Sequence, residues 1–254
     1  MTAYLEVQGV SKRYGGLQAL DKCSFTISRN KTTCLVCPNG AGKTTIFNVI
    51  TGFTRPDAGT ITFNGKTLNG LPPRAIIRGG IARTFQNLRL FEEMTALDNV
   101  IVYLSGDDAV GPIAALGRPF FTNAALKHKK ERALQLLEDV GLAHKADDVP
   151  RNLSFGQQKL LCIARVLATG ADLLLLDEPT SGLSQSALSG MVDMVHKLRD
   201  QGRTLLVVEH NTRIVQRIAD EILFLHQGRL ITQGSPDKIV TDPKLAEIYF
   251  GGVL

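Results

Sequence analysis

The sequence predicts an α/β fold in which a mixed sheet carries an antiparallel β part near the N-terminus and is interrupted by a helical insert. Residues 32–36, 172–176 and 204–208 are apolar runs with little alternation, which is typical of buried strands in a parallel sheet. A polar or glycine-rich turn and a helical pattern follow each run. Segments 4–10 and 20–27 instead alternate apolar and polar residues, as half-buried strands do. Ligands of open α/β sheets bind at the carboxyl ends of the parallel strands, so we expect the functional residues there.

Shorter signals place further elements. Residues 59–63 form a strand that is closed by the turn pair Asn64-Gly65. A helix over 129–140 ends at Gly141. Residues 106–123 are rich in Gly, Pro and Phe without a clear period, which predicts a loop with an apolar tip.

Composition sets only broad limits on function. The chain has 254 residues, 44% of them hydrophobic, which is enough for a sizeable core, and its net charge of +5 discriminates weakly between partners. No run approaches the roughly 18 consecutive apolar residues that a membrane-spanning helix needs. The first six residues lack the basic start and apolar run of a secretion signal. We therefore expect a cytosolic protein.

A glycine-rich loop follows the first apolar run. Its glycines let the backbone wrap closely around phosphate, Lys43 would reach the β- and γ-phosphates, and Thr44 would offer a hydroxyl to Mg²⁺. A helix over 43–51, stopped by Gly52, directs its positive end at the same charge. The residues expected to bind nucleotide are Asn39, Gly40, Ala41, Gly42, Lys43, Thr44 and Thr45.

Cys37 departs from this loop pattern, which usually begins with glycine. If the position needs a positive φ, cysteine costs about 1 kcal/mol of strain, and if it only ends the strand the cost is small. Cys34 and Cys37 also form a C-x-x-C pair, but Cys23 and Cys162 do not supply the second pair of a metal site. We expect buried thiols, with oxidation of Cys37 that gates nucleotide binding as the alternative.

Two adjacent carboxylates follow the leucine run 173–176. Asp177 is expected at the strand tip, where it would hold Mg²⁺ directly or through water. Glu178 faces a different way and would polarise the attacking water. Phosphoryl transfer requires mostly positioning and charge neutralisation, so two carboxylates with separate tasks suit it.

The segment Leu153-Ser154-Phe155-Gly156-Gln157 predicts a second anion site. Ser154 is a helix cap, and apolar residues recur at helical spacing from Leu160 to Leu167 before Gly170. The Ser154 hydroxyl, the Gly156 amide and the helix N-terminus together would bind an anion. One chain cannot easily direct two such sites at one phosphate.

An L-S-x-G-Q segment upstream of a strand that ends in Asp-Glu resembles the ATP-binding cassette (ABC) family, whose ATPase subunits power transport across membranes. The resemblance covers nearly the whole chain. It implies a P-loop nucleotide-binding domain of ABC type that uses ATP and Mg²⁺. It also implies a RecA-like core with the antiparallel β part over 1–86 and 160–254, and a helical signature subdomain over 87–159.

The resemblance assigns further roles. His210 would contact the γ-phosphate, with Asn211 capping the helix 212–219, and Gln86 would touch Mg²⁺ and water and signal to the permease. Tyr14 would stack on adenine. Glu178, His210 and Gln86 are thus the expected catalytic residues, and Thr44, Gln86 and Asp177 the expected metal ligands.

The family also implies partners. Two subunits pair head to tail, so that Ser154, Gly156 and Gln157 of each cover the nucleotide held by the other. Residues 181–184 would lie along that seam, with Ser184 where Asp or Asn is usual. Leu88-Arg89-Leu90-Phe91 would receive a coupling helix of the membrane permease, and the loop 106–123 would touch the permease or lipid.

Three stretches are similar to one subgroup, the bacterial high-affinity uptake systems for branched-chain amino acids and related amides. They are the run 81–91, the variant Leu153–Gln158 and the ending from Gly234 through 249–252. The resemblance implies a sister ATPase subunit in a heterodimer, or else a homodimer, and a periplasmic substrate-binding protein. It places the chain peripherally on the cytoplasmic face of the inner membrane and implies no nucleic acid.

Alternatives stay open at this point. Cys37 and Ser184 motivate a nucleotide-binding regulatory subunit with weak turnover, and the cargo could be another one, such as urea or lipopolysaccharide. A soluble cassette protein of translation or DNA repair is a third reading. Such proteins usually carry two cassettes or a long coiled-coil insert, and this chain has neither. The leading interpretation is a transport ATPase, because the residues expected to act on phosphate are all present.

Overall fold

The computed structural model describes residues 3–38, 40–104 and 123–240, and backbone contacts divide the chain into two compact units. The first unit comprises Met1–Gln86, Asp172–Ser181 and Gln185–Leu254, and the second comprises Asn87–Ala171 and Gly182–Ser184. The contacts keep the whole of helix α5 (Phe155–Ala168) in the second unit, whereas the sequence-based boundary at 159/160 divides this helix. Residues 161–168 of α5 are buried on every side of the helix, and its first turn is exposed or half-buried.

The first unit contains a six-stranded mixed sheet. Its order is β10-β9-β3-β8-β7-β6, and only the β9–β10 pair is antiparallel. The bounds are β3 (Thr32–Val36), β6 (Ile81–Arg83), β7 (Leu173–Asp177), β8 (Thr204–Val208), β9 (Glu221–His226) and β10 (Arg229–Gly234). The three apolar runs of the sequence form the neighbouring strands β3, β8 and β7, which confirms them as buried parallel strands.

Strand register aligns the carboxyl ends of these three strands. Val208 pairs with Leu35 on one side and with Asp177 on the other, so β3, β8 and β7 end at the same edge of the sheet. The loops that carry the predicted functional residues therefore leave the sheet together.

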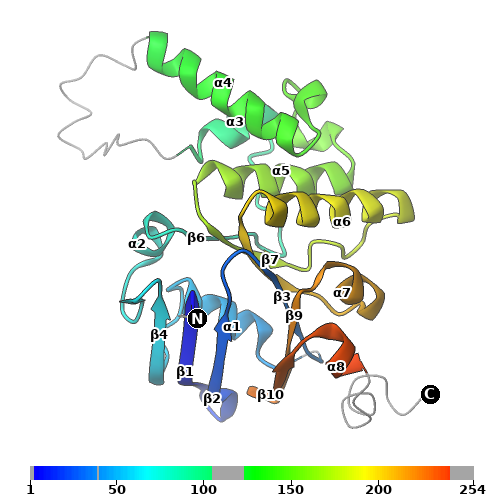
Figure 1. Cartoon of the computed structure of the whole chain (residues 1–254). Coiled ribbons are helices and arrows are strands. Elements are labelled where there is room, and N and C mark those ends of the chain that lie inside the picture. The colour runs from blue at the N-terminus through cyan, green and yellow to red at the C-terminus, as the bar shows by residue number, and fades with distance from the viewer. Residues whose placement is uncertain (1–2, 39, 105–122, 241–254) are drawn as a thin grey trace, which may run out of the picture. The chain divides into compact units, whose positions relative to one another are not determined.

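An antiparallel sheet forms the N-terminal β part, in the order β2-β1-β4-β5, and Figure 1 labels β2, β1 and β4 side by side. Its strands are β1 (Leu5–Tyr14), β2 (Leu17–Ile27), β4 (Ala58–Phe63) and β5 (Lys66–Thr67). Asn64 and Gly65 have φ values of 47° and 77°, the conformation that a two-residue hairpin turn requires. The predicted turn is confirmed.

Helix α1 (Lys43–Ile50) packs its buried residues Ile46, Phe47, Val49 and Ile50 into the core that also holds residues of both sheets. Thr51 ends the helix, and Gly52 follows with a φ of 74°, as expected. The other helices of this unit are α2 (Pro73–Arg78), α6 (Gln185–Asp200), α7 (Thr212–Ile218) and α8 (Pro236–Val240). Asn211 caps α7 through its side chain, as predicted.

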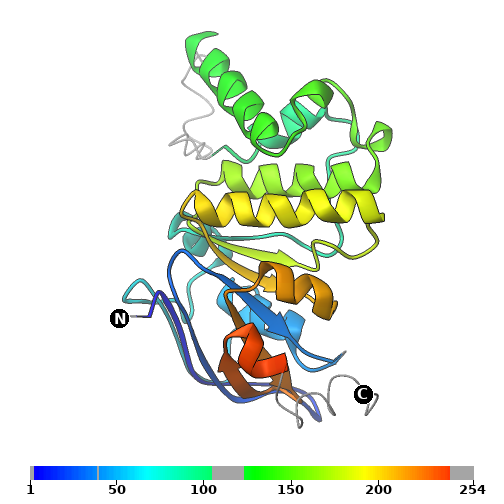
Figure 2. The ribbon, with the colours of Figure 1, turned by 45° about the vertical axis from the view of Figure 1, so that its right-hand side comes forward.

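Helices α3 (Ala96–Ile101), α4 (Asn123–Asp139) and α5 pack on one another in the second unit (Figure 2). Two short 3₁₀ turns, Ala143–Lys145 and Pro150–Asn152, join α4 to α5. Helix α4 begins six residues before the predicted start at 129, and Gly141 follows its end with a φ of 76°. Residues 105–122 of the predicted loop lie outside the described residues. None of the helices described in either unit has the length and apolar character that crossing a bilayer would demand.

Gly228 lies where the backbone leaves no room for a side chain. It lies in the Gln227–Gly228 turn between β9 and β10, with a φ of 74°. A Cβ atom there would lie 2.6 Å from the carbonyl oxygen of Ala19 and 2.9 Å from the Cα of Leu20 in β2. Its amide donates to the Ala41 carbonyl (3.1 Å), so this turn supports the loop that precedes α1.

We expect Gly228→Ala to lower the free energy of unfolding by about 2–4 kcal/mol, because backbone overlap adds to left-handed strain. Gly65→Ala is the matched control, since its φ of 77° is similar but nothing lies within 4 Å of its Cβ position. It should cost about 1 kcal/mol, the strain alone. Urea denaturation of both variants measures the difference. Equal losses would contradict the close approach of the two backbones.

Candidate functional site

The phosphate loop, residues 37–45, connects β3 to α1. Gly42 is the N-cap of α1 with a φ of 105°, and a Cβ atom there would lie 2.6 Å from the Ala19 carbonyl oxygen. Gly40 is exposed with a φ of 80°. Both positions therefore require glycine for conformation, and Gly42 requires it for space as well. Asn39 was predicted here and lies outside the described residues.

The start of α1 suits an anion. First-turn amides of a helix lack acceptors within the helix, and no side chain caps α1. No acidic residue occupies its first turn. Thr44 is exposed and Thr45 half-buried, and both lie in that turn. The loop thus combines two glycines of positive φ with the positive end of a helix, as a phosphate site does.

Glu178 brings three predicted residues together. It follows β7 with a φ of 48°, an uncommon conformation for glutamate, and its amide donates to the Val208 carbonyl (3.1 Å). Glu178 Oε1 lies 3.3 Å from Lys43 Nζ and 3.9 Å from His210 Nδ1. Lys43, Glu178 and His210 come from segments that follow three neighbouring strands, and they meet at one point.

Asp177 ends β7 beside two residues that sequence reasoning missed. Arg83 Nη2 lies 3.5 Å from Asp177 Oδ2, and the Asp177 amide donates to Thr84 Oγ1 (3.0 Å). Arg83 is itself fixed by a 2.7 Å hydrogen bond to Asn48. Gln86 lies two residues beyond Thr84 and is exposed. The predicted metal ligands Thr44, Gln86 and Asp177 all offer oxygen donors, the kind that Mg²⁺ prefers.

Glu209 was also missed. This carboxylate is 1% exposed, and its Oε1 accepts hydrogen bonds from the Thr180 amide (3.0 Å) and hydroxyl (2.6 Å). It thereby ties the segment after Glu178 to the segment that holds His210. The available signal was an acidic residue that directly extends the apolar run of β8.

Tyr14 lies at the tip of the β1–β2 hairpin and is 45% exposed. Two residues earlier in β1, Lys12 pairs with Leu20, whose side chain lies 3.1 Å from the Cβ position of Gly42. The hairpin tip thus lies only a few residues along β1 and β2 from the point where β2 touches the phosphate loop. The Lys12 ammonium stands 5.5 Å from the Tyr14 ring centroid. Stacking of this ring on adenine stays a prediction.

The L-S-x-G-Q segment opens α5 in the second unit. Ser154 and Gln157 form a capping box, in which Ser154 Oγ accepts from the Gln157 amide (3.3 Å) and Gln157 Oε1 accepts from the Ser154 amide (2.9 Å). The cap is confirmed. The Phe155 ring is 48% exposed and lies 3.0 Å from the Cβ position of Gly182.

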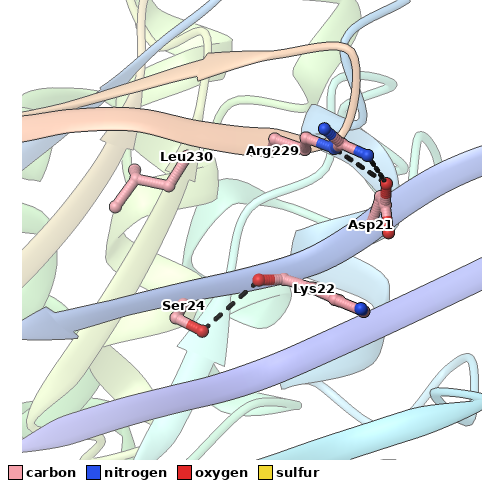
Figure 3. Close-up of a pocket in the computed structure, with 5 residues that line it drawn as sticks. All are labelled: Asp21, Lys22, Ser24, Arg229 and Leu230. Atoms are coloured by element: carbon pink, nitrogen blue, oxygen red, sulfur yellow. Dashed lines mark hydrogen bonds and ion pairs between the residues drawn. The ribbon is translucent and has the colours of Figure 1, made fainter.

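A separate cavity of about 430 Å³ lies between β2 and β10 (Figure 3). Its lining residues are Asp21, Lys22, Ser24, Arg229 and Leu230. Arg229 Nε donates to Asp21 Oδ2 (2.7 Å), so this cation already has a carboxylate partner. None of the five is a predicted site residue, and we assign this cavity no function.

A family model described as ABC transporter matches residues 20–181, which include the phosphate loop, the L-S-x-G-Q segment and Asp177-Glu178. The chain belongs to the ABC transporter family.

Known proteins are similar to this ABC cassette over nearly its whole length. The high-affinity branched-chain amino acid transport ATP-binding protein LivG of Salmonella typhimurium is 37% identical over 248 residues, 97% of each chain. A solved ATP-binding cassette of an ABC transporter in its ADP conformation is 31% identical, with a TM-score of 0.83 over 99% of this chain and 100% of that one. A bacterial ABC transporter cassette solved as a dimer is 26% identical, with a TM-score of 0.76 over 91% and 98%. The chain is an ABC-type ATPase cassette.

Cys37 fits the loop of this cassette without strain. It is 2% exposed and lacks a positive φ, so it only ends the strand. Burial raises the pKa of its thiol to about 12, although Lys43 opposes the shift. All four cysteines are free and buried, and the described part of the chain holds no cluster of three or more metal-binding side chains. The strained-loop alternative is wrong, and buried thiols are confirmed.

We expect the Cys37 thiol of the folded cassette to react with iodoacetamide about 1,000-fold more slowly at pH 8 than an ordinary thiol. The pKa rises from 9.0 to about 12, three pH units, and only the thiolate reacts. The neutral thiol is favoured in the folded state, so this contribution to stability is complete below pH 9 and is lost as the pH rises towards 12. Mass spectrometry of labelled peptides, with the urea-unfolded chain as control, measures the rate. Fast labelling of the folded chain would restore oxidative gating as an option.

Proposed function

We propose that this cassette is the ATP-hydrolysing subunit of an importer for branched-chain amino acids or related amides. The observation that carries the proposal is the meeting of Lys43, Glu178 and His210 where three parallel strands end. The similarity to a branched-chain amino acid transport protein supports the cargo. Specificity for the cargo resides in the other components of such a system.

The residues divide the work on ATP. Lys43 and the first-turn amides of α1 bind the β- and γ-phosphates, Glu178 polarises the attacking water, and His210 contacts the γ-phosphate. Thr44, Gln86 and Asp177 would hold Mg²⁺, which neutralises charge on the phosphates. Phosphate competes with Glu178 for the Lys43 ammonium, so nucleotide binding releases the Glu178 carboxylate for its task. The Glu209–Thr180 hydrogen bonds keep Glu178 and His210 at a fixed distance from each other while phosphate replaces Glu178 at Lys43.

The proposed function requires a second cassette, membrane permease subunits and a substrate-binding protein. Ser154, Gly156 and Gln157 of one cassette cover the nucleotide held by a second cassette, either a sister subunit or another copy of this chain. The Ser154 hydroxyl accepts one hydrogen bond in the capping box and keeps its proton for a phosphate oxygen. The dimer works at the cytoplasmic face of the inner membrane against permease subunits, and a periplasmic binding protein delivers the cargo.

Glu178→Gln tests the enzyme. The amide keeps the size of the side chain but cannot polarise water as a carboxylate does, so we expect steady-state ATP hydrolysis to fall at least about 100-fold. ATP binding should persist within about threefold, with a closed dimer trapped on a sizing column. Glu221→Gln, at the start of β9, is a matched control that should keep full activity. Unchanged hydrolysis by Glu178→Gln would sink the assigned role.

Phe91→Ala tests the coupling of hydrolysis to transport. Arg89 and Phe91 are exposed and Leu88 and Leu90 are half-buried, so Arg89 and Phe91 are the side chains of segment 88–91 most accessible to a permease. In vesicles that contain the permeases, we expect leucine uptake per ATP hydrolysed to fall about tenfold. Uptake at the parental ratio would place the coupling contact elsewhere. If the parent chain hydrolyses ATP but imports urea instead of leucine, the cargo is wrong and the ATPase stands.

A further inference from the structure

Arg165 is a buried arginine of α5 to which the expected ATPase chemistry gives no task. Arg165 is 4% exposed, and its hydrogen bonds within the described residues go to uncharged groups. Its Nη1 donates to the carbonyl oxygens of Leu88 (3.4 Å) and Arg89 (2.9 Å), and its Nη2 donates to the Tyr103 hydroxyl (2.5 Å). A buried charge is costly unless polar groups satisfy it, so these contacts and the charge sustain one another.

Two aromatic rings hold the same guanidinium. Arg165 Cζ lies 4.3 Å from the centroid of the Tyr103 ring and 5.2 Å from that of Phe91. These distances suit cation–π attraction, which strengthens when the cation is removed from water. Arg165 therefore contacts the backbone of Leu88 and Arg89, the Phe91 ring and the chain just after α3.

Asn99 fixes the other end of the segment 88–91. This residue of α3 is completely buried, and its amide oxygen accepts from the Phe91 amide (3.0 Å) while its nitrogen donates to the Phe91 carbonyl (3.0 Å). The same nitrogen reaches the carbonyls of Met94 (3.2 Å) and Thr95 (3.0 Å). Side chains from two helices thus hold the backbone of a segment that has no regular structure of its own.

The held conformation is not one that the segment adopts cheaply. Arg89 has a φ of 47°, which costs an ordinary residue about 1–2 kcal/mol. This backbone turns the carbonyls of Leu88 and Arg89 towards one guanidinium and leaves Phe91 41% exposed. Strain of this kind persists only where the surroundings enforce it.

We propose that Arg165 and Asn99 are positioning residues that clamp segment 88–91 in the shape that meets the permease. The inference rests on the proposed function for its biological meaning, since segment 88–91 is the expected coupling contact. The clamp belongs to α5, the helix that opens with the L-S-x-G-Q segment. The same helix therefore begins at the expected nucleotide contact and sets the backbone of the expected permease contact.

Hydrogen exchange of the isolated cassette tests the clamp without permease or cargo. The amides of Phe91 and Met94 are protected by hydrogen bonds to Asn99 Oδ1 and the Phe91 carbonyl, so they report on the segment. Arg165→Lys keeps the charge but loses the planar fork, and both amides should exchange about tenfold faster. Tyr103→Phe removes only the hydroxyl, and both amides should exchange about threefold faster. Arg151→Lys, the same change at an exposed arginine of this unit, should change neither amide, and the β8 amides should stay protected in every variant.

Parental exchange at Phe91 and Met94 in both Arg165→Lys and Tyr103→Phe would overturn the clamp. If Arg165→Lys unfolds, so that β8 also exchanges fast, Tyr103→Phe alone decides. A wrong cargo assignment would show as absent leucine uptake by the parent chain and would not alter the exchange result.

Transport per ATP hydrolysed separates positioning from general support of the fold. Arg165→Lys should lower this ratio about tenfold in permease vesicles, with hydrolysis by the isolated chain within about twofold of the parent. If Arg165 acts through segment 88–91, the two losses should not multiply. The Arg165→Lys, Phe91→Ala double variant should then transport as much leucine per ATP hydrolysed as the single variant with the lower ratio. Multiplied losses, or an unchanged ratio in Arg165→Lys, would overturn the coupling role.

Discussion

Parallel pairing of β3, β8 and β7 is the constraint on which the catalytic edge depends. The register places Leu35, Val208 and Asp177 side by side, so the segments that follow the three strands start from one line. Lys43, Glu178 and His210 can meet only because of this alignment, since 135 residues separate the first two along the chain. A shift of one residue in β7 would turn its alternating side chains over and move Asp177 away from Arg83 and Thr84.

Polar side chains with little solvent exposure stabilise this edge of the sheet. Arg83 of β6 pairs with Asp177 at the end of β7. Glu209, which follows β8, binds Thr180, which follows β7. Desolvation makes such groups expensive when a partner is lost, which gives the edge little freedom to rearrange. A thiol at the end of β3 adds no charge there, because burial keeps the pKa of Cys37 at about 12.

The parts of the fold that the sequence predicts are those that a local pattern encodes. The apolar runs of β3, β7 and β8, the Asn64-Gly65 turn and the cap of α5 all depend on neighbours along the chain. The short strand β6 was missed because three residues carry no period. Strands β9 and β10 form a hairpin around Gln227-Gly228, whose turn signal is weaker than Asn-Gly.

Site residues follow the same division. Lys43, Asp177, Glu178 and His210 stand in motifs, and the structure brings Lys43, Glu178 and His210 together. Arg83, Glu209 and Arg165 were not predicted, because a buried charge is recognised only by its partner, and each partner lies far away in sequence. The chemical roles of the motif residues and the division of the chain at 86/87 and 159/160 remain predictions. Tyr249 to Gly252, used for the subgroup resemblance, lie outside the described residues.

The pairing of β3 with late parts of the chain also dictates when the site can form during synthesis. The Thr32 amide bonds the Asp220 carboxylate across a separation of 188 residues, and the Gly228 amide bonds the Ala41 carbonyl. Strands β8 and β9, which pair with β3, begin at residues 204 and 221, so the ribosome must synthesise the chain at least as far as β8 before β3 gains a neighbour in the sheet. Until then strand β3, all of whose residues are buried in the fold, has no sheet to pair with, and its backbone groups and side chains are accessible to other chains or to a chaperone. In this fold the loop encoded among the first fifty residues is one of the last parts to be completed.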